Sequence, residues 1–471
     1  MSLYLTEAAR IGGGVLMAVY ALLSFLVFIY RTEKKRMVFY VLQAITMVLI
    51  QFCLFMQMLI KTGDMRYMFF FAFQAIVLIA TIVMHKLIYP DGNMLIMNNI
   101  CLLLMVSMAI LTRLSGNRAI RQFIVVALSL ILALCIPAIV HRLTFLRDIW
   151  WIYATVGIAM LAFVLILGRA VNGSNINYSV GGLSFQPSEF VKILFVFFVA
   201  ASLAKAEKLT QILGICVLAA LHVIILVFSR DLGAGLIYYV VFFFMLYIAR
   251  DRLEYLFICA VMGTMACLLA YRMFTHVRTR VAAFIDPWSK IDGAGYQVAQ
   301  SLFGISVGGP FGLGLYGGAP DAIPFAEQDF IFSAICEELG IVFAVSLLAI
   351  CLSTCLMMLW VSERIRDPFY RTLCSGFAVV YIFQVFLTVG GGVKFIPLTG
   401  VTLPLVSYGG SSVLSTIIMF GIFQGAVLIR ADEHRDAARR LKHRLIKDKN
   451  RPSSETDDED TDAEEFSDEE E

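Results

Sequence analysis

The stretch FIFSAICEELGIVFAVSLLAICLSTCLMMLWV, Phe330 to Val361, decides the fold of this 471-residue chain. Its second part, Ile341 to Val361, has no charged residue, and a helix needs about 20 apolar residues to cross a bilayer core. Similar runs recur throughout the chain, which is 60% hydrophobic and 15% charged, with a mean hydropathy of +0.84. This composition leaves too little polar surface for a soluble protein and indicates a polytopic membrane protein.

Thirteen apolar runs predict thirteen membrane-spanning helices, three early in the chain and ten after them. Their approximate ranges are 10–30, 37–60, 67–89, 97–115, 120–141, 149–168, 187–204, 208–228, 233–249, 254–275, 330–361, 368–390 and 404–430. In lipid, every backbone N–H and C=O must be satisfied within the span, and these runs are too long for barrel strands. The predicted fold class is therefore an all-α polytopic membrane protein.

Basic residues predict the orientation, because short basic loops stay in the cytoplasm. The loop RTEKKR (31–36) is the clearest anchor. Alternation from it also places 141–148, 362–371 and the tail from 430 inside, whereas the basic loop 113–121 falls outside. The N-terminus is then outside and the C-terminus cytoplasmic, and the longest loop, 276–329, faces the exterior. The first run lacks a basic leader and a cleavage site, so we expect a retained helix.

The cysteines, histidines and tail limit the classes of site and partner. All ten cysteines lie in apolar runs and the six histidines form no ligand pattern, which argues against disulfides and zinc. The basic stretch 435–447 suits anionic lipid headgroups. After Pro452 the acidic segment SSETDDEDTDAEEFSDEEE is too polar to fold, and we predict disorder. Membrane lipids are expected partners, and nucleic acid is not.

Two polar clusters begin predicted helices. In QPSEFVKILF, Glu189 and Lys192 share a helix face, where they can bind a charged ligand or form an internal ion pair. In AEQDFIFSAICEELG, Asp329 lies at the outer mouth of a helix, and Glu337 and Glu338 follow about 12–14 Å further along. A partly buried Asp329 can act as a general base; capping of the helix N-terminus is the alternative.

Two exterior segments add donors and flexible backbone. Residues 278–318 hold Arg278 and Arg280, which suit phosphate contacts, and many glycines without the strand of a dinucleotide fingerprint. A flexible re-entrant loop is the alternative. GGGVKFIPLTGVTLPLVSYGGSS (390–412) is broken by prolines, and broken backbone at membrane depth must line a cavity or be buried. We therefore expect the polar outer segments to converge on one cavity. The candidate donors of this last segment are Lys394, Ser407, Tyr408, Ser411 and Ser412.

Five ordered motifs make the sequence resemble the FtsW/RodA/SpoVE (SEDS) family of peptidoglycan glycosyltransferases, over residues 97 to 430. They are FQPSE with its following lysine (185–192), DLG (231–233), GYQ…QS (295–301), DFIF…EELG (329–340) and PLTG…LPLVSYGGSS (397–412). The GYQ…QS motif adds Gln297, Gln300 and Ser301 as substrate-binding candidates. Departures from the family pattern are Asn175, Ile176, Asn177, Arg230, Phe325, Glu327 and Gln328.

The resemblance implies a ten-helix core with a large outer loop, and polymerisation of lipid II. The acceptor's GlcNAc 4-hydroxyl would attack the donor's MurNAc anomeric carbon and displace undecaprenyl diphosphate with inversion. The family's essential aspartate falls on Asp329, and its glutamate–lysine pair falls on Glu189 and Lys192. Arg278, Arg280, Lys394 or a divalent cation (Mg²⁺ or Mn²⁺) could stabilise the leaving diphosphate, and the polyprenyl tail would lie in a groove between helices.

The resemblance also implies a partner, a class B penicillin-binding transpeptidase, and a role in elongation, division or sporulation. The expected organisation is additional N-terminal helices in 1–92, the SEDS-like core in 93–430, and a basic then acidic tail in 431–471. Two other functions stay open. A flippase or transporter would use Glu189, Lys192, Glu337 and Glu338 as a path, and a non-catalytic scaffold would need none of them.

Overall fold

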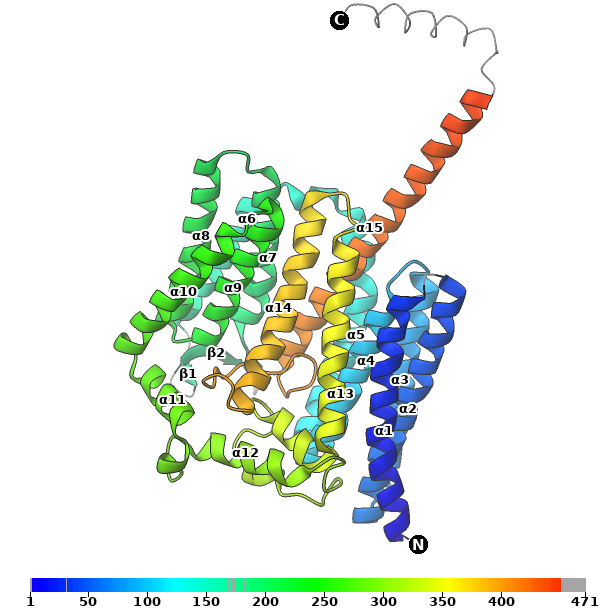
Figure 1. Ribbon diagram of the computed structural model, residues 1–471, viewed down its shortest axis with the longest axis vertical. Coiled ribbons are helices and arrows are strands. Elements are labelled where there is room, and N and C mark those ends of the chain that lie inside the picture. The colour runs from blue at the N-terminus through cyan, green and yellow to red at the C-terminus, as the bar shows by residue number, and fades with distance from the viewer. Residues whose placement is uncertain (1, 31, 168, 172–173, 181–182, 450–471) are drawn as a thin grey trace, which may run out of the picture.

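The computed structural model describes residues 2–30, 32–167, 169–171, 174–180 and 183–449. Within these residues twelve helices are long and apolar enough to span a membrane, and the shorter α6 is a further apolar helix (Figure 1). The prediction of a helical polytopic membrane protein is thereby confirmed. The twelve are α1 (Ser2–Ile29), α2 (Glu33–Thr62), α3 (Arg66–Ile88), α4 (Met94–Leu114), α5 (Gly116–Arg142), α7 (Pro187–Lys205), α8 (Leu209–Phe228), α9 (Leu232–Arg250), α10 (Glu254–Met273), α13 (Ile331–Ser362), α14 (Pro368–Gly392) and α15 (Gly410–Lys449).

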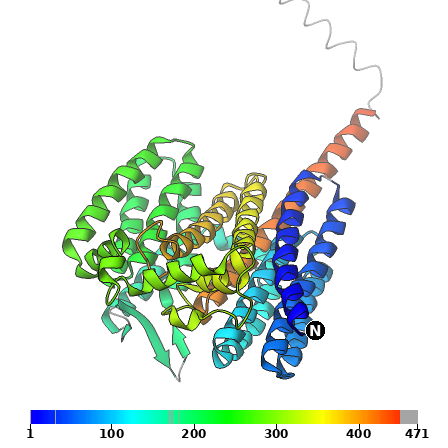
Figure 2. The same cartoon turned by 60° about the horizontal axis from the view of Figure 1, so that its bottom comes forward.

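The helices form one bundle with two ends. At one end, which we name the loop face, lie the N-terminus and the helices α11 (Thr275–Ile285) and α12 (Tyr296–Gly308) (Figures 1 and 2). From the other end, the tail face, α15 extends away from the bundle (Figure 1). Helices α1–α3, the N-terminal unit, pack along one side of the bundle against α4 and α13. Helix α4 is completely enclosed, because every side chain from Met94 to Thr112 is buried.

A buried polar network fixes the N-terminal unit inside the apolar bundle. The Asn99 side-chain oxygen on α4 accepts hydrogen bonds from Tyr20 (3.2 Å) and Ser24 (3.3 Å) of α1. Its amide nitrogen donates to Ser353 (3.1 Å) and Thr354 (3.0 Å) of α13. Such interhelical bonds hold membrane helices together where lipid removes the hydrophobic difference between contact and separation. Helices α1, α4 and α13 therefore share one polar joint.

Helix α13 is broken at Gly340, whose φ of 84° lies in the left-handed region that favours glycine. The loop that follows α12 pairs with the break. The backbone N–H groups of Leu313 and Gly314 donate to the carbonyls of Glu337 and Glu338, at 2.9 and 2.8 Å. Beyond the break, Ile341 N–H donates to Gly309 O at 3.0 Å. A loop thus satisfies the backbone groups that a continuous helix would satisfy by itself.

The connections contain structure that the sequence did not predict. Between α6 (Trp150–Leu167) and α7, β1 (Arg169–Val171), β2 (Ser174–Val180) and β3 (Leu183–Phe185) form a small antiparallel sheet in the order β1-β2-β3. The predicted exterior loop 276–329 holds most of α11, all of α12 and the short 3₁₀ turns η2 (Trp288–Lys290) and η3 (Pro320–Ala322); a further turn, η1 (Thr144–Arg147), follows α5. The basic stretch continues α15 to Lys449, and the acidic segment lies outside the described residues.

Candidate active site

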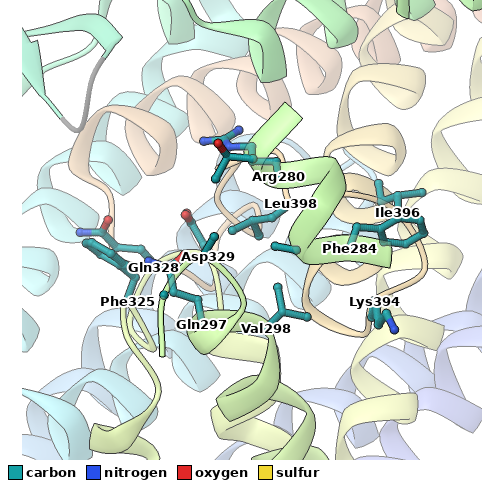
Figure 3. A pocket seen from close by; sticks show the side chains of 15 residues that line it. Arg280, Phe284, Gln297, Val298, Phe325, Gln328, Asp329, Lys394, Ile396 and Leu398 are labelled. Atoms are coloured by element: carbon teal, nitrogen blue, oxygen red, sulfur yellow. The ribbon is translucent and has the colours of Figure 1, made fainter. Parts of the chain in front are cut away.

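A cavity of about 450 Å³ opens at the loop face (Figure 3). Its walls come from α11, from α12, from the residues just before α13 and from the connection between α14 and α15. These are parts of the loop 276–329, the DFIF segment and the segment 390–412. The structure brings them together around one space, as their polar, broken sequences predicted.

Asp329 lines this cavity directly before the first turn of α13. Burial raises the pKa of Asp329 to about 6, while the positive charge of Arg280 lowers it. Within the described part of the chain its carboxylate accepts no hydrogen bond, and Phe330, rather than an acidic side chain, occupies the N-cap of α13. The capping alternative is therefore not what the geometry shows. A carboxylate that is partly dehydrated, accepts no hydrogen bond from the described residues and lies next to a cavity can accept a proton.

Two cationic side chains share the cavity with Asp329. Arg280 on α11 donates to the Thr399 carbonyl at 2.9 Å, which fixes its guanidinium beside the carboxylate. Lys394, in the connection after α14, lines the same space. Arg278 does not: it is exposed and donates to Thr275 Oγ1 at 3.2 Å on its own helix. The cavity therefore combines one acid with two cations, a combination suited to a phosphate-bearing ligand.

The three candidates of the GYQ…QS motif occupy different places. Gln297 lines the cavity. Ser301 is fully buried, where its hydroxyl contacts Ser333 Oγ at 2.5 Å and donates to Gly392 O at 2.7 Å. Gln300 is not among the lining residues. Ser301 thus joins α12 to α13 and α14, and Gln297 is the member of the motif that can meet a ligand.

Among the lining residues that were not predicted as site residues, three have side chains suited to contact a ligand. Phe325 and Gln328 precede Asp329, and Phe284 lies one helical turn after Arg280 on α11. The first two could have been found from their closeness to Asp329. Phe284 required the knowledge that 275–285 is helical, because only then do residues four apart share a face. An aromatic side chain in such a wall gives a sugar ring or a lipid an apolar surface.

The polar residues after Pro404 hold the segment that carries Asp329 and do not line the cavity. Ser407 Oγ donates to the Gln328 carbonyl at 2.6 Å, and the Tyr408 N–H donates to the Glu327 carbonyl at 2.7 Å. The Ser411 hydroxyl accepts from Gln186 N–H at 3.1 Å, and Ser412 accepts from Thr402 Oγ1 at 3.0 Å. Ser407 and Tyr408 thus hold the segment that carries Asp329, whereas Ser411 and Ser412 bond to residues outside that segment. The roles of all four as substrate ligands stay predictions.

Glu189 and Lys192 form an internal ion pair away from the cavity. Lys192 Nζ donates to Glu189 Oε2 and to Gln384 Oε1, both at 2.8 Å, and Ser415 Oγ donates to Glu189 at 3.0 Å. Their side chains are only 13% and 7% exposed. The pair links α7 with α14 and α15, so the geometry favours the structural alternative, and a role in substrate binding stays a prediction.

The other two membrane carboxylates hold the loop after α12. Glu337 accepts from the Ala319 N–H at 2.6 Å. Glu338 accepts from the Tyr316 N–H at 3.0 Å and forms a buried ion pair with Arg113 at 2.9 Å. From the sequence, Glu337 and Glu338 could belong to a transport path. In the structure both carboxylates are engaged in local contacts.

The N-terminal unit contacts the same loop through three hydrogen bonds. We name the bonded segment, residues 309–316, the latch loop. Its backbone pairs with α13 as described above, and its tip meets α1, α2 and α3 in turn. The bonds join Arg10 Nη1 to Gly312 O (2.6 Å), Leu315 N to Gln57 Oε1 (3.2 Å) and Tyr67 Oη to Tyr316 Oη (2.7 Å). The first half of α13, which follows Asp329 in the chain, is thereby connected to the N-terminal unit.

An apolar groove of about 440 Å³ lies beside the cavity, between α9, α10 and α14. Arg280, Ile396 and Leu398 line both spaces, so the two adjoin. Helix α10 forms the outer side of this region and has no buried residue. A groove of this kind next to a charged cavity suits a ligand with a polar head and an apolar tail.

The fold and the site define a multi-pass membrane protein with an ionisable cavity at one end of its helical bundle. A family described as cell cycle protein (FTSW_RODA_SPOVE) matches residues 92–428. The chain belongs to this FtsW/RodA/SpoVE family. Among the described spans, α1–α3 precede the matched region.

Curated relatives carry two names. Peptidoglycan glycosyltransferase RodA of Mycobacterium tuberculosis is 38% identical over 304 residues, covering 59% of this chain and 65% of the relative. The chain thus spans less than two thirds of the length of the mycobacterial relatives. A probable peptidoglycan glycosyltransferase FtsW of Halomonas elongata is 32% identical over 360 residues, covering 71% of this chain and 87% of the relative.

Two solved structures share the fold. A chain of a peptidoglycan synthase complex that coordinates polymerization and crosslinking is 23% identical, with a TM-score of 0.62, covering 72% of this chain and 98% of that chain. The rod shape determining protein RodA of Thermus thermophilus is also 23% identical, with a TM-score of 0.54, covering 72% of this chain and 97% of that chain.

Proposed function

We propose that this protein is a peptidoglycan glycosyltransferase that polymerises lipid II on the outer face of the bacterial cytoplasmic membrane, for elongation, division or sporulation. One observation carries the proposal. In a member of this family, Asp329 lies in a cavity with its pKa raised to about 6 and with Arg280 beside it, and Lys394 lines the same cavity. The names of the mycobacterial and Halomonas relatives support the same activity.

The chemistry follows from these three side chains. Asp329 removes the proton from the acceptor's 4-hydroxyl as the oxygen attacks the donor's anomeric carbon, and the bond to undecaprenyl diphosphate breaks with inversion. A base with a pKa of about 6 is largely ionised at neutral pH, yet it binds a proton more readily than an ordinary carboxylate. Charge that develops on the leaving diphosphate is stabilised by Arg280 and Lys394. The diphosphate needs no general acid.

A divalent cation is part of the proposal as a candidate. The cavity offers the Asp329 carboxylate and the amides of Gln297 and Gln328, and Mg²⁺ often takes one or two carboxylates together with substrate phosphates. Bound Mg²⁺ or Mn²⁺ would add positive charge near the diphosphate. Chelation by EDTA tests this part of the proposal, and polymerisation at full rate in EDTA would contradict it.

The apolar groove beside the cavity is the proposed place of the polyprenyl tail. It opens between α9, α10 and α14, and it meets the cavity at Arg280. The diphosphate would then lie where the groove and the cavity join. This arrangement puts the apolar tail against the membrane helices and the sugars at the loop face.

We propose that the loop face is the outer face, with the N-terminus outside and the C-terminus cytoplasmic. The basic loop 113–121 is an exception to the rule that short basic loops stay in the cytoplasm, because it lies at the loop face. Two of its arginines are neutralised there: Arg113 pairs with Glu338 and Asp321, and Arg118 pairs with Glu327. The orientation is supported by the other basic segments, 31–36, 141–148, 362–371 and the tail from 430, which all fall on the cytoplasmic side.

The proposed partners are lipid II, membrane lipids and a class B penicillin-binding transpeptidase, which would crosslink the new strands. The likeness of the fold to a chain of a peptidoglycan synthase complex motivates the transpeptidase. Nucleic acid is not a proposed partner.

Glycan-strand formation from purified lipid II tests the function. The wild type, Asp329→Asn and the control Asp321→Asn would each be assayed with a transpeptidase partner whose crosslinking is inactivated. Asp321 is exposed and lies outside the cavity, eight residues before Asp329. We expect Asp329→Asn to lose about 10²–10⁴-fold in rate, as for loss of a general base, and Asp321→Asn to stay near the wild type. Polymer from none of the proteins would favour a flippase or scaffold, and equal polymer from all three would move the catalytic role elsewhere.

A further inference from the structure

The tail face carries three arginines around one tryptophan. Trp360 lies in the last turn of α13, and the guanidinium carbons of Arg364, Arg36 and Arg430 lie 3.5, 5.4 and 5.8 Å from the centroid of its ring. Arg36 comes from the first turns of α2, Arg364 follows α13, and Arg430 belongs to α15. We name these four residues the arginine cluster. Three segments far apart in the sequence therefore bring like charges to one place.

These charges lack matching carboxylates. Among the ion pairs of the described residues, none involves an arginine of the cluster. Arg430 feels repulsion from Arg364 and Arg36, and attraction from Glu433. Glu433 in turn accepts a hydrogen bond from the Arg366 backbone N–H at 3.2 Å. The cluster thus keeps a net positive charge that an anion can neutralise.

The cluster lies where an apolar helix surface meets water. Trp360 ends a stretch without charge that begins at Ile341, and tryptophan favours the membrane interface. One and two turns before it on the same face of α13, Leu356 and Leu352 expose 40% and 45% of their surface. Apolar surface therefore runs from Trp360 along α13, in the direction that an acyl chain would take.

We propose that the arginine cluster binds the phosphate group of an anionic phospholipid. Guanidinium groups form paired hydrogen bonds with phosphate oxygens, and three of them from different directions can surround one phosphate. The exposed Leu356 and Leu352 of α13 would contact an acyl chain. The site joins α2 of the N-terminal unit to α13 and α15 of the core. It lies at the opposite end of the bundle from the cavity and does not depend on the proposed function.

Two measurements on the full chain, delipidated in detergent, test this site. They are native mass spectrometry and thermal unfolding. The ligands are phosphatidylglycerol, phosphatidylcholine and inorganic phosphate. We expect phosphatidylglycerol to bind and to raise the unfolding temperature more than the other two do. Because Arg364→Gln removes one charge-assisted hydrogen bond to the phosphate, this variant should bind phosphatidylglycerol roughly tenfold more weakly. Arg364 is exposed, so this variant should fold.

Arg366→Gln is the matched control, because its side chain is exposed in the same turn and is not part of the cluster. It should bind like the wild type. The triple variant Arg36→Gln, Arg364→Gln, Arg430→Gln should lose the preference for phosphatidylglycerol over phosphatidylcholine. Equal binding by Arg364→Gln, Arg366→Gln and the wild type would overturn the proposal. An equal effect of inorganic phosphate would overturn the lipid as the ligand.

Discussion

Asp231 and Asp329 both stand at the start of membrane helices, but their surroundings differ. Asp231 caps α9: its carboxylate accepts from the Ala234 N–H at 3.1 Å and from Ser188 Oγ at 3.2 Å. Asp329 accepts no hydrogen bond from the described residues and lines a cavity. The carboxylate of Asp231 therefore stabilises the start of α9. The carboxylate of Asp329 faces the cavity, where it can contact a ligand. The DLG and DFIF motifs alone do not reveal this difference.

The pH dependence of glycan polymerisation should report Asp329. The pKa of Asp329 is raised to about 6, so the active, ionised base is lost as the pH falls through about 6. The charge of Arg280 lowers this pKa. Arg280→Gln should therefore move the acid limb of the rate profile to higher pH. A profile measured from pH 5 to 8 checks this, with Arg278→Gln, two residues away and outside the cavity, as the control. An unmoved limb in Arg280→Gln would contradict the coupling.

Arg278 and Arg280 also show what the sequence could and could not predict about the site. Asp329, Arg280, Gln297 and Lys394 were predicted and do meet in one cavity. Arg278 was indistinguishable from Arg280 until the segment was known to be helical. On a helix, residues two apart point to different sides, so only one of them can face the cavity. The serines after Pro404 offered donors in the sequence, but the fold uses them to hold Glu327 and Gln328.

At the scale of the elements, long apolar runs predicted the spans because hydrocarbon thickness is a local constraint. The break in α13 was not predicted, since it depends on a partner. A Cβ at Gly340 would lie 2.3 Å from the Gly312 nitrogen of the latch loop, and the positive φ is available only at a cost to other residues. The sheet before α7 and helices α11 and α12 were missed for a related reason. Their short, mixed sequences take their structure from the bundle that they cover.

Gly340→Ala should destabilise the protein by roughly 2–5 kcal/mol, the sum of overpacking against the latch loop and a left-handed backbone. The control is Gly214→Ala in α8, where a Cβ would meet nothing within 4 Å. That variant should be neutral or slightly more stable, because alanine is the better helix former. Thermal unfolding in detergent measures both. Similar unfolding temperatures for the two variants would contradict this expectation, because they would mean that the latch loop can move to accommodate the added methyl group.

At the scale of the whole molecule, the latch loop connects the N-terminal unit to α13, the helix that follows Asp329. Gln57→Leu removes the acceptor of the buried Leu315 N–H. An unsatisfied buried N–H costs about 1–3 kcal/mol, so local opening should rise about 5–150-fold. Hydrogen exchange of the latch-loop amides measures it. Gln51→Leu is the control on the same helix, because Gln51 donates to Gln74 of α3 at 3.1 Å and does not touch the loop. Unchanged exchange in Gln57→Leu would mean that α13 alone secures the loop.

The contacts of the latch loop also have a consequence for biogenesis. Residues 309–316 meet Arg10, Gln57 and Tyr67, which leave the ribosome far earlier. At about 5–20 residues per second, roughly 10–50 s of synthesis separate Tyr67 from Tyr316. The first three helices are therefore inserted, and their docking surface is formed, before the loop exists. In each new molecule the N-terminal unit is therefore in place first, and the latch loop packs against it when the later part of the chain has been made.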